Sequence, residues 1–314
     1  MKIVLLLKEA FYEADKNLIP ELEKIGEVKV LHTDSGIGKE QVKTEVKDAD
    51  IILVNIVKLD KEVIDAASNL KCIIKFGAGI DNIDVDYARQ KNIRVTSAPG
   101  VNAPAVADHA FGLMLSAARR IPKKDSEVKS GVWQTEMGFE VSGKTLGIIG
   151  FGAIGKELAK RATGFSMKTL VYGNHKDYVL AEQLNAHFVD KDVLFREADF
   201  IVVATSLTAK NRHLVNAATL GQMKPTAFLV NISRGQLVDE KALAESLQKG
   251  GIAGAALDVF EQEPPANGLP QFDNVIATPH IGGATYEAVA RISKLSISNI
   301  RKLKKGDALD FEIK

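Results

Sequence analysis

The sequence predicts an α/β protein with two doubly wound, parallel-sheet domains and a cleft between them. Short apolar runs alternate with helical segments along nearly the whole chain, a pattern typical of βαβ units whose parallel sheets are covered on both faces. The length of 314 residues suits two domains of roughly 150 residues each. A Gly-x-Gly-x-x-Gly motif also lies between an apolar run and a helical segment near the middle of the chain.

The predicted strands form two series, separated by a break at Pro99-Gly100. The first series is Ile3–Leu7, Val28–Leu31, Ile51–Val54, Cys72–Lys75 and Val95–Ser97. The second is Leu146–Ile149, Thr169–Tyr172, Phe200–Ala204, Ala227–Asn231, Gly254–Val259 and Val275–Thr278. We predict one domain over 101–282, and a discontinuous domain made of 1–100 together with 283–314 and its final helix, Tyr286–Leu303.

Composition excludes several classes of protein. The chain has 41 Lys and Arg against 40 Asp and Glu, so it lacks the excess of positive charge typical of proteins that bind nucleic acid or an anionic membrane. The single cysteine, Cys72, excludes a disulfide framework, and the six histidines show no metal-ligand spacing, so no metal is predicted. No uncharged apolar run approaches the roughly 20 residues that span a bilayer. The sequence therefore predicts a soluble, cytoplasmic protein.

Two glycine motifs follow one another, and only the second has the right context. Residues 138–145 match the P-loop by letter, but they lead into a strand where a P-loop opens a helix. Gly150-x-Gly152-x-x-Gly155 follows a strand and precedes the helix predicted over Ala153–Thr163. In a dinucleotide site the first glycine permits the tight turn, the second the approach of the pyrophosphate, and the third close helix–strand packing. We predict dinucleotide binding here.

The loop after Tyr172 bears on the choice of cofactor. NAD sites usually place a carboxylate there, which accepts a hydrogen bond from the ribose 2′-hydroxyl. This chain has Gly173, Asn174, His175 and Lys176 instead, and a lysine with polar neighbours suits a 2′-phosphate. The loop favours NADP(H) over NAD(H). The alternative is that Lys176 is a solvated charge and the site accepts NAD.

Three residues with complementary chemistry follow predicted strand ends: Arg234, Glu263 and His280. Ligands of open α/β sheets bind outside these ends. Reduction of a 2-oxo acid needs a cation for the carboxylate, a proton donor for the ketone oxygen, and a group that keeps this donor protonated. Arginine, histidine and glutamate supply these functions, and a nicotinamide supplies hydride. Singly, each residue also has an ordinary structural interpretation.

The chain resembles the D-isomer-specific 2-hydroxyacid dehydrogenase family over essentially its whole length. The resemblance implies that Arg234 binds the substrate carboxylate, His280 is the acid/base and Glu263 orients it. It also implies a homodimer formed through the Ala-rich helix predicted over Ala103–Arg120. The motifs that carry the resemblance lie at 77–84, 99–103, 143–155, 223–225, 231–239, 255–264 and 279–283.

The same resemblance implies further binding residues. Asp258 corresponds to a contact with the nicotinamide carboxamide, and the N–H groups of Ala78 and Gly79 to donors for the substrate carboxylate. Asn55 is a further predicted substrate contact. The remaining predicted cofactor contacts are Ala153, Ile154, Ser206, Ile232, Ser233, Gly282 and Gly283.

Within the family, the chain is most similar to glyoxylate/hydroxypyruvate reductases. No arginine follows the strand Ile51–Val54, where phosphoglycerate dehydrogenases hold the substrate phosphate, although Lys58 leaves that alternative open. A second alternative, from a different class, is a non-catalytic nucleotide-binding redox sensor or co-repressor-like scaffold. An inactive member is expected to lack part of the Arg, Glu and His set, and all three are present.

Overall fold

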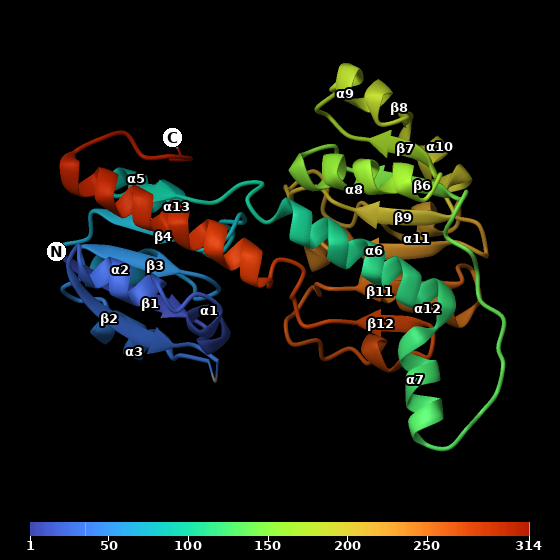
Figure 1. Ribbon diagram of the computed structural model, residues 1–314, viewed down its shortest axis with the longest axis horizontal. Helices are drawn as coiled ribbons and strands as arrows, with labels where there is room; N and C mark the ends of the chain where they lie inside the picture. Colours follow the sequence, from blue (N-terminus) through green and yellow to red (C-terminus); the bar gives the residue numbers. More distant parts are fainter. Residues whose placement is uncertain (35, 314) are drawn as a thin grey trace. The chain divides into compact units, whose positions relative to one another are not determined.

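The computed structural model describes residues 1–34 and 36–313, and the chain divides into two compact units (Figure 1). Unit 1 consists of Met1–Asn102 and Gly283–Lys314, and unit 2 of Ala103–Gly282. The chain passes into unit 2 two residues later than the sequence predicted. Both units are α/β with parallel sheets, so the predicted fold class is confirmed.

The sheet of unit 1 has the strand order β2-β1-β3-β4-β5, with all neighbours parallel. The order in which the chain adds strands reverses between β1 and β3. The carboxyl ends of these two strands therefore flank a topological switch point, where such sheets bind ligands. Its strands are β1 (Lys2–Leu7), β2 (Glu27–His32), β3 (Ile51–Val54), β4 (Cys72–Lys75) and β5 (Arg94–Thr96).

Helices cover both faces of this sheet, and the side chains of β1 point alternately to the two faces. Ile3, Leu5 and Leu7 pack with α1, α2 and α13, while Val4 and Leu6 pack with α3, α4 and α5. All five side chains are fully buried, which explains the continuous apolar run. The helices are α1 (Glu9–Ala14), α2 (Leu18–Glu23), α3 (Lys39–Glu45), α4 (Lys61–Ala66), α5 (Val85–Gln90) and α13 (Tyr286–Lys305).

The sheet of unit 2 has the order β12-β11-β10-β9-β6-β7-β8, again with parallel neighbours. The chain enters this sheet at β6, adds β7 and β8 on one side, and then adds β9 to β12 on the other side. The pair β6 and β9 is therefore the switch point. The strands are β6 (Thr145–Ile149), β7 (Lys168–Tyr172), β8 (Ala186–Phe188), β9 (Phe200–Val203), β10 (Phe228–Asn231), β11 (Gly254–Leu257) and β12 (Val275–Ala277).

Helices also cover both faces of the second sheet. α6, α8 and α9 pack on one face, and α10, α11 and α12 on the other. α7 follows α6 but buries none of its residues. The bounds are α6 (Ala103–Arg119), α7 (Ile121–Lys129), α8 (Ala153–Gly164), α9 (Tyr178–Gln183), α10 (Lys191–Glu197), α11 (Ala217–Leu220) and α12 (Glu240–Gln248), with the 3₁₀ turns η1 (Gly235–Leu237) and η2 (Leu269–Gln271).

Two local features differ from the sequence predictions. The edge strand β8 was not predicted, because three residues are too few to show a strand period. The long helix ends at Arg119, since Arg120 takes a left-handed conformation with φ 51° before α7 starts. No helix in the described part of the chain is long and apolar enough to cross a membrane.

Candidate active site

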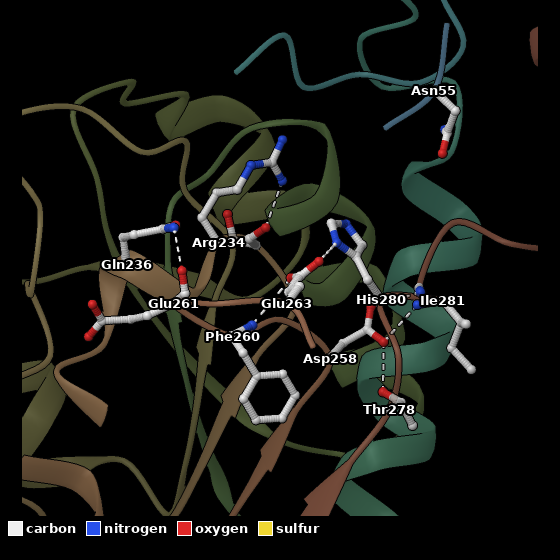
Figure 2. Close-up of polar contacts among 12 residues, drawn as sticks. Asn55, Arg234, Gln236, Asp258, Phe260, Glu261, Glu263, Thr278, His280 and Ile281 are labelled. Carbon is white, nitrogen blue, oxygen red and sulfur yellow. Dashed lines mark hydrogen bonds and ion pairs between the residues drawn. The ribbon is translucent and has the colours of Figure 1, made fainter. Parts of the chain in front are cut away.

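Three adjoining strands of unit 2 place the predicted catalytic residues at one edge of the sheet. β10 ends shortly before Arg234, β11 before Glu263 and β12 before His280. Because β10, β11 and β12 are parallel neighbours, their carboxyl ends lie side by side. Figure 2 shows the three side chains gathered in one region.

His280 and Glu263 form a direct pair. Nδ1 of His280 lies 2.9 Å from Oε2 of Glu263, and Oε1 of Glu263 accepts from the N–H of Phe260 at 3.3 Å (Figure 2). The Nε2 atom of His280 has no hydrogen-bond partner within residues 1–34 and 36–313, and the side chain is 46 % exposed. The carboxylate therefore fixes one ring nitrogen and leaves the other open to a ligand.

The charge of Glu263 is maintained by its neighbours. Burial by itself raises the pKa of this carboxyl, but the hydrogen bond and charge of His280, the Phe260 N–H and the charge of Arg234 together hold the pKa below its ordinary value. Glu263 is therefore ionised near neutral pH. An ionised carboxylate can only accept a hydrogen bond, so Nδ1 of His280 carries the hydrogen of this contact.

Close backbone packing locks the Arg234 turn onto the Glu263 loop. A Cβ on Gly235 would lie 1.8 Å from the carbonyl carbon of Phe260, so only glycine fits after the arginine. Gln236 also donates to the carbonyl of Glu261 at 3.0 Å (Figure 2). Arg234 itself donates from Nη1 to the carbonyl of Ser233 at 2.7 Å. The Arg-Gly sequence thus sets the geometry of both loops.

A buried network anchors the backbone that carries His280. Asp258, 2 % exposed, accepts from the N–H groups of Ile281 (2.9 Å) and Gly282 (2.8 Å) and from Oγ1 of Thr278 (2.6 Å). His280 has φ 55°, a strained conformation for a non-glycine residue, and its N–H donates to the carbonyl of Asp258 at 2.9 Å. These contacts hold the loop in a conformation that it would not adopt alone.

His109 on α6 completes this network and was not singled out from the sequence. Its Nε2 lies 3.1 Å from Oγ1 of Thr278 and 3.3 Å from Oδ1 of Asp258. Burial raises the pKa of Asp258, but His109, Thr278 and the two backbone donors outweigh burial and hold the pKa below its ordinary value. Both oxygens of Asp258 are thus engaged within the chain, and its predicted contact with a nicotinamide stays a prediction.

The glycine motif has the local geometry that a pyrophosphate requires. Gly150 has φ 107°, and a Cβ on Gly155 would lie 2.0 Å from the carbonyl oxygen of Gly150, so these positions need glycine for the turn and for packing. Gly152 is the N-cap residue of α8, and a Cβ there would meet nothing within 4 Å. The N–H groups of Gly152, Ala153 and Ile154 have no partner within the described chain. A dinucleotide phosphate fits these donors at the helix N-terminus.

The loop after β7 offers no carboxylate in 173–176. Asn174, His175 and Lys176 are all exposed. The next residue, Asp177, caps α9 through the N–H of Leu180 and pairs with Nζ of Lys156 at 2.7 Å. The nearest acid is therefore engaged elsewhere, and the exposed part of the loop is polar and basic.

The other predicted cofactor residues lie in both units. Ser206, Ile232, Ser233 and Gly282 belong to unit 2, where the hydroxyl of Ser233 donates to the carbonyl of Thr205. Gly283 belongs to unit 1, where a Cβ would lie 2.7 Å from Nδ2 of Asn102.

The predicted substrate residues lie together in unit 1. Asn55, after β3, donates from Nδ2 to the carbonyl of Phe76 at 2.8 Å, and Phe76 opens the loop that contains Ala78 and Gly79. The N–H groups of Ala78 and Gly79 have no partner in the described chain, and Ala78 is exposed. This loop thus presents two backbone donors to an anion.

Three side chains of types that can bind a metal lie together in unit 1. Ligand atoms of Glu9, His32 and Asp34 all lie within 4.8 Å of one another, although the residues are separated in sequence. All three are exposed, and Asp34 Oδ2 already accepts from the N–H of Glu9 at 2.8 Å.

A parallel α/β sheet with a glycine-rich turn at its switch point is the arrangement of dinucleotide-binding enzymes. Residues 111–282 match the model of the D-isomer specific 2-hydroxyacid dehydrogenase, NAD binding domain. The chain is 41% identical to a glyoxylate reductase of Pyrococcus furiosus over 303 residues, covering 93% of this chain and 90% of that one. This chain belongs to the D-isomer specific 2-hydroxyacid dehydrogenase family.

Further relatives carry related names. A hydroxypyruvate reductase of Thermotoga maritima is 41% identical over 277 residues, which are 86% of this chain and 90% of that one. A D-3-phosphoglycerate dehydrogenase of Methanocaldococcus jannaschii is 42% identical over 93% of this chain but only 56% of its own length. Among solved structures, the TT0316 protein of Thermus thermophilus superposes with a TM-score of 0.91 and 32% identity over the full length of both chains.

Proposed function

We propose that the protein reduces a small 2-oxo acid of the glyoxylate or hydroxypyruvate type to the corresponding D-2-hydroxy acid. The observation that carries this proposal is the His280–Glu263 pair at 2.9 Å, which joins the segments after β12 and β11, next to the end of β10 that precedes Arg234. The two related reductases described above are named for glyoxylate and hydroxypyruvate, which supports this substrate class.

His280 serves as the proton donor during reduction. When bound, the reduced nicotinamide supplies hydride to the carbonyl carbon. The carbonyl oxygen takes a proton from Nε2 of His280, and Glu263 stabilises the imidazolium before the transfer. One oxo acid, one hydride and one proton thus give one hydroxy acid, and the neutral imidazole regains its proton from solvent.

Arg234 supplies the cation of the site. A guanidinium binds a carboxylate through two parallel hydrogen bonds and favours developing negative charge on an adjacent oxygen. In unit 1, the N–H groups of Ala78 and Gly79 are our proposed donors to the substrate carboxylate, because the chain leaves both unpaired.

We propose that the cofactor pyrophosphate binds at the N-terminus of α8 and that NADP(H) is preferred over NAD(H). The absence of a carboxylate in 173–176 and the exposed Lys176 support this preference. Lys176→Glu is expected to raise the KM for NADPH by about tenfold or more while changing the KM for NADH little, because it replaces a partner of the 2′-phosphate by a repelling charge. Equal effects on both cofactors would contradict the assignment of this loop.

The experiment that tests the function is a matrix of initial rates of nicotinamide oxidation. Glyoxylate, hydroxypyruvate, pyruvate and phosphohydroxypyruvate are each assayed with NADPH and with NADH. Fast turnover of glyoxylate or hydroxypyruvate is the expected result. A clear preference for phosphohydroxypyruvate would favour the phosphoglycerate dehydrogenase alternative. Intact cofactor binding with no turnover of any oxo acid would favour the non-catalytic sensor.

A further inference from the structure

A lysine is buried at the carboxyl end of β4, directly before the loop with the unpaired N–H groups. Lys75 is 8 % exposed, although lysine is among the residues least often buried. Its Nζ donates to Oδ1 of Asn82 at 2.6 Å and to the backbone carbonyl of Asn55. Burying an ammonium is costly unless its hydrogen bonds are satisfied, so these contacts specify its position.

The contacts of Lys75 hold the loops that follow β3 and β4. Asn82 also donates from Nδ2 to the carbonyls of Asn55 (3.1 Å) and Val57 (2.7 Å), and Asn55 donates to the carbonyl of Phe76 at 2.8 Å. Lys75 therefore lies at the centre of a network that fixes both ends of the loop 76–82. β3 flanks the topological switch point of this sheet, and β4 is the next strand.

The side chain of Lys75 also packs against the loop itself. Gly77 has φ 146°, and a Cβ there would lie 3.6 Å from Cε of Lys75 and 4.0 Å from Nδ2 of Asn55. The next two residues are Ala78 and Gly79. The Lys75 side chain thus packs against Gly77, the residue before these donors, and its ammonium is shielded from most solvent, where a charge acts more strongly than on the surface.

We propose that Lys75 is the positioning and specificity residue of an anion-binding loop in unit 1, formed by 76–79, which selects substrates that carry a free carboxylate. This inference rests on the proposed function. Lys75 holds the loop that carries the Ala78 and Gly79 donors in place and keeps a buried positive charge at the start of this loop. Neither effect requires the lysine to touch the substrate.

The preference for a free acid over its ester provides a direct test. The ratio of kcat/KM for the best oxo acid to kcat/KM for its methyl ester is measured in wild type, Lys75→Met, Lys75→Gln and Lys75→Arg. The matched control is Lys71→Met, which removes the same charge from an exposed lysine directly before the same strand.

We expect Lys75→Met and Lys75→Gln to lower this ratio by about 10- to 100-fold, the range typical of losing an interaction with a charged group. Lys75→Arg and Lys71→Met are expected to retain it within a few fold. A merely structural lysine would lower turnover of acid and ester together and leave the ratio unchanged. If Lys75→Met does not fold, the test rests on Lys75→Gln, because glutamine retains a side-chain hydrogen-bond donor.

Two further outcomes separate this inference from the proposed function. An unchanged ratio in both neutral variants, with oxo acids still reduced, would overturn the inference alone. If the wild-type protein reduces no oxo acid, the proposed function fails, and calorimetric titration with oxamate then tests the loop without turnover. Equal oxamate affinity in wild type and Lys75→Gln would overturn the inference there too.

Discussion

At the scale of single residues, the two partners of the His280–Glu263 pair have different expected effects. His280→Ala is expected to lower kcat by about 10²- to 10⁴-fold, the usual contribution of a general acid, and to leave the cofactor Kd unchanged. Steady-state rates and a calorimetric titration with NADPH measure both quantities. Unchanged turnover would refute the role of His280.

Glu263→Gln is expected to act through pH. Without the carboxylate that is 2.9 Å from Nδ1, the protonated imidazole loses its stabilising partner. Because the pKa of Glu263 is held below its ordinary value, the wild-type rate is expected to lose this partner's contribution only as the pH falls into the acid range, and the variant is expected to lack that acid-side dependence. A pH profile of kcat measures this, and a uniform loss of rate at every pH would indicate a structural role instead.

Asp258→Asn tests the anchor of the His280 loop. The amide places an N–H₂ group among donors, so at least one of the Ile281 and Gly282 N–H groups loses its acceptor, and we expect a loss of about 1–3 kcal/mol of unfolding free energy at pH 7. Because the pKa of Asp258 is lower in the folded than in the unfolded protein, its contribution is fully present above the unfolded value and lost as pH falls through the folded one.

Urea unfolding between pH 3 and 7 measures both effects. The variant is expected to be less stable at pH 7 and to lose less stability than wild type as the pH falls. Parallel stability curves for the two proteins would contradict a charge-dependent anchor.

At the scale of elements, the turn between β6 and α8 depends on its glycines, and Gly155 provides the test of helix–strand packing. Gly155→Ala is expected to destabilise the protein by about 1–3 kcal/mol, since its Cβ would meet the Gly150 carbonyl, and to weaken cofactor binding at this turn. Gly164→Ala, in the same helix, meets nothing within 4 Å and is the matched control. Thermal unfolding and NADPH titration of both variants measure stability and cofactor affinity. Equal stability and equal affinity of the two variants would contradict the packing role of Gly155.

The sequence predicted this element well because its signal is local. The strand, three glycines and helix all lie within 145–164, and buried parallel strands such as β3 and β4 appear as unbroken apolar runs. Edge strand β8 escaped prediction because it is short. The break at Arg120 escaped prediction because a left-handed arginine has no sequence signature.

The candidate site was predictable only in part for the same reason. Arg234, Glu263 and His280 each follow a recognisable strand, so parallel topology alone brings them to one edge. The His109–Asp258 contact joins α6 to the loop after β11 and depends on tertiary packing. The Lys75 network likewise appears only when the loops after β3 and β4 lie together.

At the scale of the whole molecule, the homodimer is predicted through the helix over Ala103–Arg120, and exposed apolar side chains continue into the next segment, 121–139. Trp133 is 89 % exposed and Met137 85 %, and Ile121 and Val128 on α7 are also exposed. Large exposed apolar side chains in one segment are typical of an interaction surface. We propose that a second copy of the chain covers this segment.

The double variant Trp133→Lys, Met137→Lys is expected to shift the protein from dimer to monomer, because two charges would be buried without partners in the interface. Sedimentation equilibrium measures the mass. NADPH titration checks that unit 2 remains folded. The control is Tyr286→Lys, which changes a 74 % exposed aromatic residue of unit 1 outside this segment and is expected to remain dimeric. A monomeric wild-type protein, or a variant that dimerises as strongly as wild type, would remove this segment as the interface, whereas the catalytic proposal depends on residues outside it and would stand.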